Sequence, residues 1–339
     1  MLGITNVTIM TMKRFIYTFI IAAMTFAVCG CTVKSDAPSK NTAGENYDVV
    51  VVCSDEAWRG DLSYAVCDLL EAPTPGLTRP QGLFNIVKQV APDKASNIDM
   101  MYGNLLVINI NTAVTEPSFS VEKNVYARPQ TVVIITAPTV TSATAFVTTA
   151  ADAIREVLED GERKKSNGYY AQRPAEELMA DFKATTGFDM LIPQSFFKAT
   201  TADKSLTWYL RDYPTKAQYI FTYESVYTNP EDMTPKWLMM SLDNKLSSIT
   251  SKGAVGSYLG VSEQAPVYAT TVERGGREWV ELRGWWEVNN DFMGGPFVSF
   301  SSVDEADDKI LTIMFALYAP EDPQRNLLRE LEHLFYTLK

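Results

Sequence analysis

The order of the strand-like and helix-like segments is the feature that most restricts how this chain can fold. Residues 47–53 are apolar on both alternating faces, which predicts a central strand. Residues 56–71 carry a helical apolar stripe, and several strand-like runs then follow without a regular strand–helix alternation. Such an order favours the α+β class, with mixed or antiparallel sheets covered by helices.

The chain divides into two loosely similar halves, residues 47–165 and 174–339. Each half reads as a strand, a helix, further strands and a closing helix, which we expect over residues 141–165 and 324–338. The segment 160–173 is polar, charged and contains glycine, so it predicts the boundary between the halves. The halves are either separate domains or parts of one compact unit.

The N-terminal residues predict where in the cell the protein is located. Lys13 and Arg14 precede an apolar run over residues 15–28, which is too short for a comfortable transmembrane helix and is typical of a signal peptide. The run ends in Val28-Cys29-Gly30-Cys31, the pattern of a bacterial lipobox. We therefore expect residues 1–30 to be a signal peptide, Cys31 to carry the lipid, and residues 31–46 to include a flexible tether.

The charge of the chain restricts its partners. The formal net charge is −11, which argues against nucleic acid, because phosphate binding requires clustered Lys and Arg. An anionic bilayer would also repel such a body, so the lipid rather than charge would hold the protein at the membrane. We expect a cell-envelope protein at the outer membrane, facing the periplasm.

Cysteine and histidine usage restricts the chemistry. Cys53 and Cys67 remain after the lipobox, and they are either a disulfide pair or two buried thiols. The single histidine, His333, excludes most His-based metal sites and most Ser-His-Asp catalysis. We expect His333 to be exposed on the last helix, off its leucine stripe. We assign no catalytic residue, metal ligand or cofactor.

Several short motifs along the chain carry a family resemblance. They are Asn46 with the valine-rich strand, Trp58, Pro73-Thr74-Pro75-Gly76-Leu77 with Pro80 and Phe84, Arg283-Gly284-Trp285-Trp286, Met293-Gly294-Gly295-Pro296-Phe297, and Tyr318-Ala319-Pro320. As a set they resemble the uncharacterised lipoproteins of the Bacteroidetes that are classed as a domain of unknown function. The resemblance implies an envelope lipoprotein and carries no activity over.

Residues 278–288 form the most informative strand. The even positions suit a core face, and the odd positions place two indoles with three charged groups on the other face. That second face is either a binding face for a protein or glycan, or ordinary packing under a covering segment. Its members are Trp279, Glu281, Arg283, Trp285 and Glu287.

The turn after this strand is the candidate pocket loop. It contains Asp291, Met293, Gly294 and Gly295, which together with Trp285 and Glu287 are expected to converge on a pocket. The two adjacent glycines either turn their N–H groups toward an anion or make a tight connection between strands.

These observations favour a non-catalytic binding or scaffolding module anchored in the envelope, with a protein or glycan partner. The alternative is a carboxylate-dependent hydrolase that acts on glycan or peptidoglycan, with Glu287 and Asp291 as its acidic pair.

Overall fold

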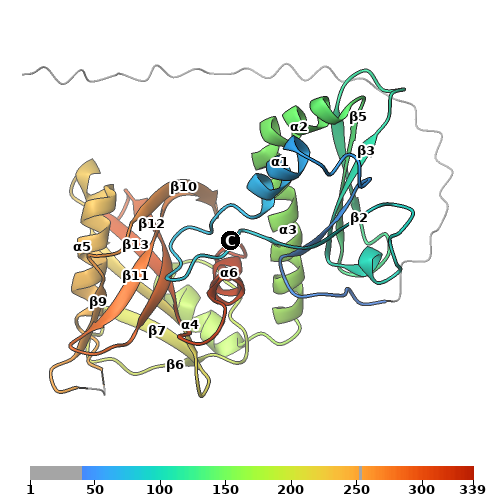
Figure 1. Cartoon of the computed structure of the whole chain (residues 1–339). Coiled ribbons are helices and arrows are strands. Elements are labelled where there is room, and N and C mark those ends of the chain that lie inside the picture. The colour runs from blue at the N-terminus through green and yellow to red at the C-terminus, as the bar shows by residue number, and fades with distance from the viewer. Residues whose placement is uncertain (1–39, 252–253) are drawn as a thin grey trace, which may run out of the picture. The chain divides into compact units, whose positions relative to one another are not determined.

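The computed structural model describes residues 40–251 and 254–339, and they contain two β-sheets with helices packed against them (Figure 1). All of these residues fall within one structural unit. One sheet is mixed and the other antiparallel, which confirms the predicted α+β class. The predicted signal peptide, Cys31 and residues 31–39 lie outside the described residues.

The first half of the chain forms a five-stranded sheet in the order β2-β1-β3-β5-β4. Four strands are parallel, and the edge strand β4 runs antiparallel to β5. The bounds are β1 (Asp48–Val52), β2 (Asn85–Val90), β3 (Asn104–Ile110), β4 (Ser118–Lys123) and β5 (Thr131–Ala137).

The strand β1 lies in the interior of this sheet, between β2 and β3, as its apolar pattern predicted. Val49 and Val51 join one core cluster, whereas Val50 and Val52 join the cluster on the opposite face. Because successive side chains of a strand point to opposite faces, a strand with four consecutive valines fits only where both faces are covered.

Helices α1 (Asp61–Leu70), α2 (Val140–Thr149) and α3 (Ala151–Tyr170) pack on the Val49 face of this sheet. We expected one helix over residues 141–165, and this prediction is wrong at both its middle and its end. The helix is interrupted at Ala150, which has φ −96° and ψ 9°. Beyond Lys165 the helix continues for another turn, because Ser166 is buried and Asn167 donates a hydrogen bond to the His333 carbonyl at 2.9 Å.

The second half forms an eight-stranded antiparallel sheet in the order β10-β11-β12-β13-β8-β7-β6, with β9 also paired to β11. The bounds are β6 (Phe197–Lys198), β7 (Leu206–Asp212), β8 (Ala217–Val226), β9 (Tyr258–Val261), β10 (Tyr268–Arg274), β11 (Arg277–Asn289), β12 (Gly294–Asp304) and β13 (Lys309–Tyr318).

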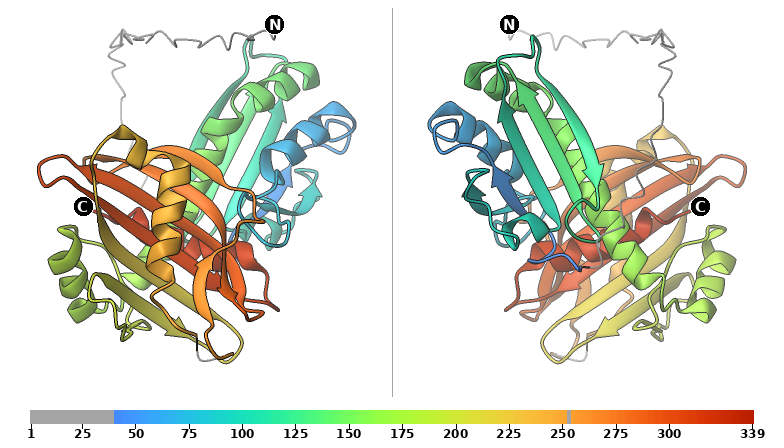
Figure 2. Two further views of the ribbon diagram at one scale, coloured as in Figure 1. Left: turned by 90° about the vertical axis from the view of Figure 1, so that its left-hand side faces the viewer. Right: turned by 90° about the vertical axis from the view of Figure 1, so that its right-hand side faces the viewer.

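Helices cover both faces of this second sheet. Helix α5 (Pro235–Leu246) packs on one face through Leu242 and Leu246, and Figure 2 shows it crossing the strands. Helices α4 (Glu176–Thr186) and α6 (Gln324–Phe335) contribute to the core on the other face. Helix α4 ends at Gly187, whose φ of +80° is the left-handed conformation that commonly closes a helix.

Two short 3₁₀ turns complete the described elements, at Asp99–Met101 and Pro230–Met233. Residues 40–46 differ from the predicted flexible tether, because their backbone pairs with the first half. The N–H of Ala43 donates to the Met101 carbonyl at 2.8 Å, and the N–H of Arg128 donates to the Lys40 carbonyl at 2.9 Å. The tether prediction is therefore wrong for this segment, since main-chain pairing orders it without an apolar pattern.

Candidate functional site

The predicted binding face of β11 is buried for most of its length. Trp279 is fully buried between Phe188 and Phe335, and its indole N–H donates to the Arg274 carbonyl at 2.9 Å. Glu281 and Arg283 are also buried. Helix α6 packs over this side of the strand. These three residues therefore cannot form part of an open binding face.

Arg283 is the centre of a buried charge network. Its Nε donates to Glu281 Oε1 and its Nη2 donates to Glu332 Oε1, each at 2.6 Å. Arg329 extends the network, with Nη1 3.7 Å from Glu332 Oε1 and Nη2 3.3 Å from Glu159 Oε1. The network links β11, α6 and α3, so its role is structural.

The pKa values of the two carboxyl groups bonded to Arg283 are shifted in opposite directions. Burial alone would raise the pKa of Glu332, but Arg283 and Arg329 outweigh it and lower the pKa to about 2. Burial raises the pKa of Glu281, and Arg283 opposes that rise only in part. Glu332 is thus the permanent anion between the two guanidinium groups.

His333 is buried, so the prediction of an exposed histidine is wrong. Its Nε2 lies 2.7 Å from the Tyr47 hydroxyl in a hydrogen bond. Burial lowers the pKa of His333 to about 3, and Arg329 and Arg163 act in the same direction while Glu332 opposes them. The polar face of α6 is covered by the first half of the chain, which the leucine stripe alone does not reveal.

The predicted pocket loop does converge on a hollow. Asp291, Met293, Gly294 and Gly295 line it together with Trp285 and Glu287. Its volume is about 440 Å³, and we call it the loop hollow. It is completed by Thr78, Arg79, Ser262, Trp286, Phe292, Pro320 and Gln324. The indole nitrogen of Trp285 is buried and has no hydrogen-bond partner among the described residues.

The adjacent glycines of this loop serve close packing rather than anion binding. Both belong to strand β12, and neither has a positive φ. A Cβ on Gly295 would lie 2.0 Å from the Leu317 carbonyl oxygen, and one on Gly294 would lie 2.8 Å from the Trp286 carbonyl oxygen. Of the two predicted alternatives, the tight connection between strands is the one found.

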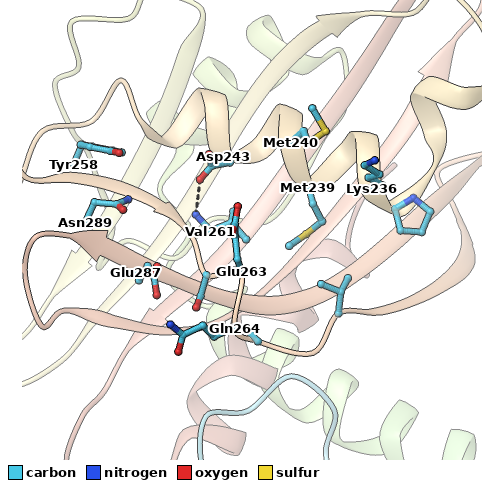
Figure 3. Close-up of a pocket in the computed structure, with 14 residues that line it drawn as sticks. Lys236, Met239, Met240, Asp243, Tyr258, Val261, Glu263, Gln264, Glu287 and Asn289 are labelled. Carbon is cyan, nitrogen blue, oxygen red and sulfur yellow. Dashed lines mark hydrogen bonds between the residues drawn. The ribbon is translucent and has the colours of Figure 1, made fainter.

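A second hollow adjoins the first and shares Ser262 and Glu287 with it. Its volume is about 720 Å³, and it lies between α5 and the strands β9 and β11. We call it the α5 hollow. Figure 3 shows Asp243 bonded to the backbone N–H of Val261, at 2.8 Å, with Met239 and Glu263 facing the space between helix and strands.

Exposed apolar side chains border both hollows. Met240, Tyr258 and Val267 line the α5 hollow, and Phe292 lines the loop hollow. All four are exposed to solvent, and Phe292 entirely so. Exposed apolar groups that gather at a concave site are typical of an interaction surface rather than of a random surface.

The α5 residues of this site were missed by the sequence reasoning. Met240 is exposed and lies off the apolar stripe of its helix, whereas the neighbouring Met239 is half-buried and packs against the core, so the stripe did not mark Met240. The segment 262–265 has no periodic pattern, so only its place beside β11 brings it to the site.

The described residues contain no helix that is long and apolar enough to cross a bilayer. Within the same ranges, no group of three or more His, Cys, Asp or Glu side chains is arranged to hold a metal ion.

The chain has an α+β fold, and the family models that match it are those of domains of unknown function. Residues 175–337 match the Domain of unknown function (DUF4837), and residues 42–170 match the Domain of unknown function (DUF8532). The predicted resemblance to a domain of unknown function is therefore confirmed. The lipoprotein and Bacteroidetes parts of that resemblance stay predictions.

No curated protein matches the chain. Two solved structures show a weak likeness, each covering 45% of this chain and 89% of its own. One is a mutant of protein Mog1, at 11% identity, and the other is the Saccharomyces cerevisiae Ran-binding protein Mog1p, at 12% identity. Both have a TM-score of 0.30, which is too low to assign a shared fold.

Proposed function

We propose that this protein is a lipid-anchored, non-catalytic binding module of the bacterial envelope. In this proposal the lipid on Cys31 holds it at the outer membrane, facing the periplasm. The loop hollow and the α5 hollow together bind a segment of a partner protein. The observation that carries the binding role is the group of exposed apolar side chains at these adjoining hollows.

The anchor rests on the lipobox before Cys31 and on the acidic charge of the chain. Replacing Cys31 with Ser tests it, with metabolic labelling by a palmitate analogue and density-gradient separation of the two membranes. We expect the unchanged protein to be labelled and to sediment with outer membrane, and the variant to lose both properties. Equal labelling of the variant would contradict the anchor.

The charges of the two hollows restrict the partner. Four carboxylates line them, on Asp243, Glu263, Glu287 and Asp291, against the cations of Lys236 and Arg79. Arg79 is also engaged, because its Nη2 donates to the Ala319 carbonyl at 3.1 Å. We therefore infer a partner segment with an apolar anchor residue flanked by Lys or Arg.

Phe292 provides the most direct test, because its side chain is fully exposed at the turn between β11 and β12. A photo-crosslinking residue at this position, in intact cells, is compared with the same residue at Tyr64, which is exposed on α1. We expect one discrete protein adduct at position 292 and none at position 64.

The identified partner is then purified and its affinity measured. We expect Phe292→Ala to weaken binding by at least about 10-fold, as truncation of an interface anchor does, while Tyr64→Ala leaves it unchanged. The same adduct at both positions would contradict the proposal, as would an affinity for the partner that Phe292→Ala leaves unchanged.

The hydrolase alternative keeps one specific observation in its favour, since Glu287 and Asp291 line the same hollow. It predicts release of products from peptidoglycan or glycan by the purified protein, with loss of that activity in Glu287→Gln and Asp291→Asn. Absence of turnover by the unchanged protein would leave binding as the function.

A further inference from the structure

A third hollow, which shares no residue with the two above, lies where α3, α6 and the β7–β8 hairpin meet. Its volume is about 950 Å³. We call it the tyrosine–arginine hollow, because Tyr169, Tyr170 and Tyr213 line it with Arg173 and Arg211. Its lining also includes the polar groups of Gln172, Gln194 and Ser195.

Arg211 forms a rigid floor for this hollow. The guanidinium is buried, and its Nε donates to Gln218 Oε1 at 2.6 Å while its Nη2 donates to Glu330 Oε2 at 3.0 Å. Its Nη1 donates to the Tyr170 hydroxyl at 3.1 Å and to Ser195 Oγ at 3.3 Å. Because Arg211 fixes both hydroxyl groups, they are preorganised to meet a ligand.

The rim of the hollow is cationic, although the chain carries a net charge of −11. Arg173 is exposed there, and it forms no ion pair within the described part of the chain. Lys216 also lines the hollow, and its Nζ is paired with Asp322 Oδ2 at 3.1 Å. Glu330 is the one carboxylate of the lining, and its charge is already paired with Arg211. The free charge at this hollow is therefore positive.

Tyrosine rings supply flat apolar surfaces beside these charges. Tyr169 has an exposed fraction of 70%, and Tyr213 one of 43%. Lys216 Nζ lies 5.9 Å from the centre of the Tyr213 ring, so the cation and the ring are presented together. Ring faces with planar amides and hydroxyl groups suit a sugar ring, which offers C–H faces and hydroxyl groups of its own.

We propose that the tyrosine–arginine hollow binds a saccharide that carries a carboxylate. Tyr169 and Tyr213 stack on the sugar rings, Ser195 and the Tyr170 hydroxyl bond to sugar hydroxyls, and Arg173 pairs with the carboxylate. This site goes beyond the protein-binding role proposed above, and each can fail without the other, because no residue is shared.

The test uses the full-length protein in detergent and three probes of similar size: trigalacturonate, neutral maltotriose and triglutamate. Binding is measured by calorimetry at low and high salt. We expect trigalacturonate to bind and to weaken at high salt, since its charge contacts lie at the surface. Maltotriose should bind at least about 10-fold more weakly, because it has no carboxylate to form a charge-assisted bond with the arginine at the rim.

Substitutions locate the binding. We expect Arg173→Gln and Tyr213→Ala each to weaken trigalacturonate binding by about 10-fold or more. The first variant loses the ion pair with the carboxylate, and the second loses a ring that stacks on the sugar. Lys94→Gln and Tyr64→Ala are the matched controls, because both residues are exposed on the first half of the chain. Both controls should bind like the unchanged protein.

Four results would overturn the proposal. Failure of trigalacturonate to bind would remove the ligand class, and equal binding of maltotriose would remove the role of the carboxylate. Binding of triglutamate as tight as that of trigalacturonate would show a site for acidic peptides instead. Retained binding in Arg173→Gln and Tyr213→Ala would place the ligand elsewhere.

Discussion

The hydroxyl of Tyr47 lies 2.7 Å from Nε2 of His333, and both side chains are buried. Tyr47 immediately precedes β1 of the five-stranded sheet, whereas His333 lies on α6, which packs on the eight-stranded sheet. The guanidinium of Arg329 lies 5.8 Å from the centre of the Tyr47 ring. The one histidine of the chain therefore serves the junction between the two sheets, and its burial makes stability depend on pH.

We predict that the protein loses stability as the pH falls below 6.5. Burial lowers the pKa of His333 to about 3 from 6.5, so between these values the unfolded chain binds a proton that the folded chain does not. The free energy of unfolding should fall by about 2 kcal/mol between pH 7.5 and pH 5 on account of this group. Urea unfolding at the two pH values measures it.

The control for this prediction is His333→Gln, which removes the titrating group and retains a polar side chain. Glu332 neighbours His333, but its pKa is lowered from 4.5 to about 2, so it contributes only below that window. The pH dependence between 7.5 and 5 should therefore be smaller in the variant by about 2 kcal/mol. Identical pH dependence in the two proteins would show that His333 does not titrate as expected.

We predict a large loss of stability for Glu332→Gln. The substitution leaves the buried guanidinium groups of Arg283 and Arg329 without the anion between them. Removing one partner of a buried ion pair costs about 3–5 kcal/mol. Asp160→Asn is the control, since Asp160 pairs with Lys164 on the surface of α3 and should cost at most about 0.5 kcal/mol. Similar losses in the two variants would contradict the structural role of the network.

We predict that Gly295→Ala and Gly168→Ala change stability in opposite directions. The new methyl group at position 295 would meet the Leu317 carbonyl oxygen, which belongs to the adjoining strand and cannot move aside freely. Overpacking of this kind costs about 1–3 kcal/mol or more. At position 168, inside α3, a Cβ meets nothing within 4 Å, so alanine should add about 1 kcal/mol. Thermal unfolding measures both changes in stability. A Gly295→Ala variant as stable as the unchanged protein would show that position 295 does not lie so close to the Leu317 carbonyl.

We predict that Cys53 and Cys67 are free and slow to react in the folded protein. Burial raises the pKa of Cys53 from 9.0 to about 11 and also raises that of the partly buried Cys67. Since the thiolate is the reactive form, Cys53 should react with iodoacetamide about 100-fold more slowly at pH 8 than an ordinary thiol.

The labelling is read by mass spectrometry on the full-length protein with Cys29 and Cys31 replaced by Ser. Denaturation without a reductant should add two labels, one for each remaining cysteine. A protein that takes up label only after reduction would contain the disulfide that the sequence left open.

The sequence predicted elements whose signal is local. The valines of β1 predicted a strand covered on both faces. The turn after β11 was also predictable as a site of convergence, because a strand and its following turn hold Trp285, Glu287 and Asp291 near one another. Each of these inferences depends on neighbours within a few residues.

The same local patterns failed where a distant segment covers a polar surface. The polar face of α6 suggested solvent, yet α3 covers it through Asn167 and through the Glu159–Arg329 pair. The odd face of β11 was ambiguous for the same reason, since α6 closes over Arg283. A polar surface that is buried in the fold has the same residue composition as one that stays exposed. The sequence alone therefore does not distinguish the two.

The sequence by itself thus determined the class of fold and, for the most regular elements, which face is apolar, because apolar periodicity records which side of an element is removed from water. Only the tertiary structure decided which polar groups are buried and which hollows form, because these depend on contacts between residues far apart in the chain. Tyr47 and His333 meet across 286 positions, and no periodicity within either element records that contact.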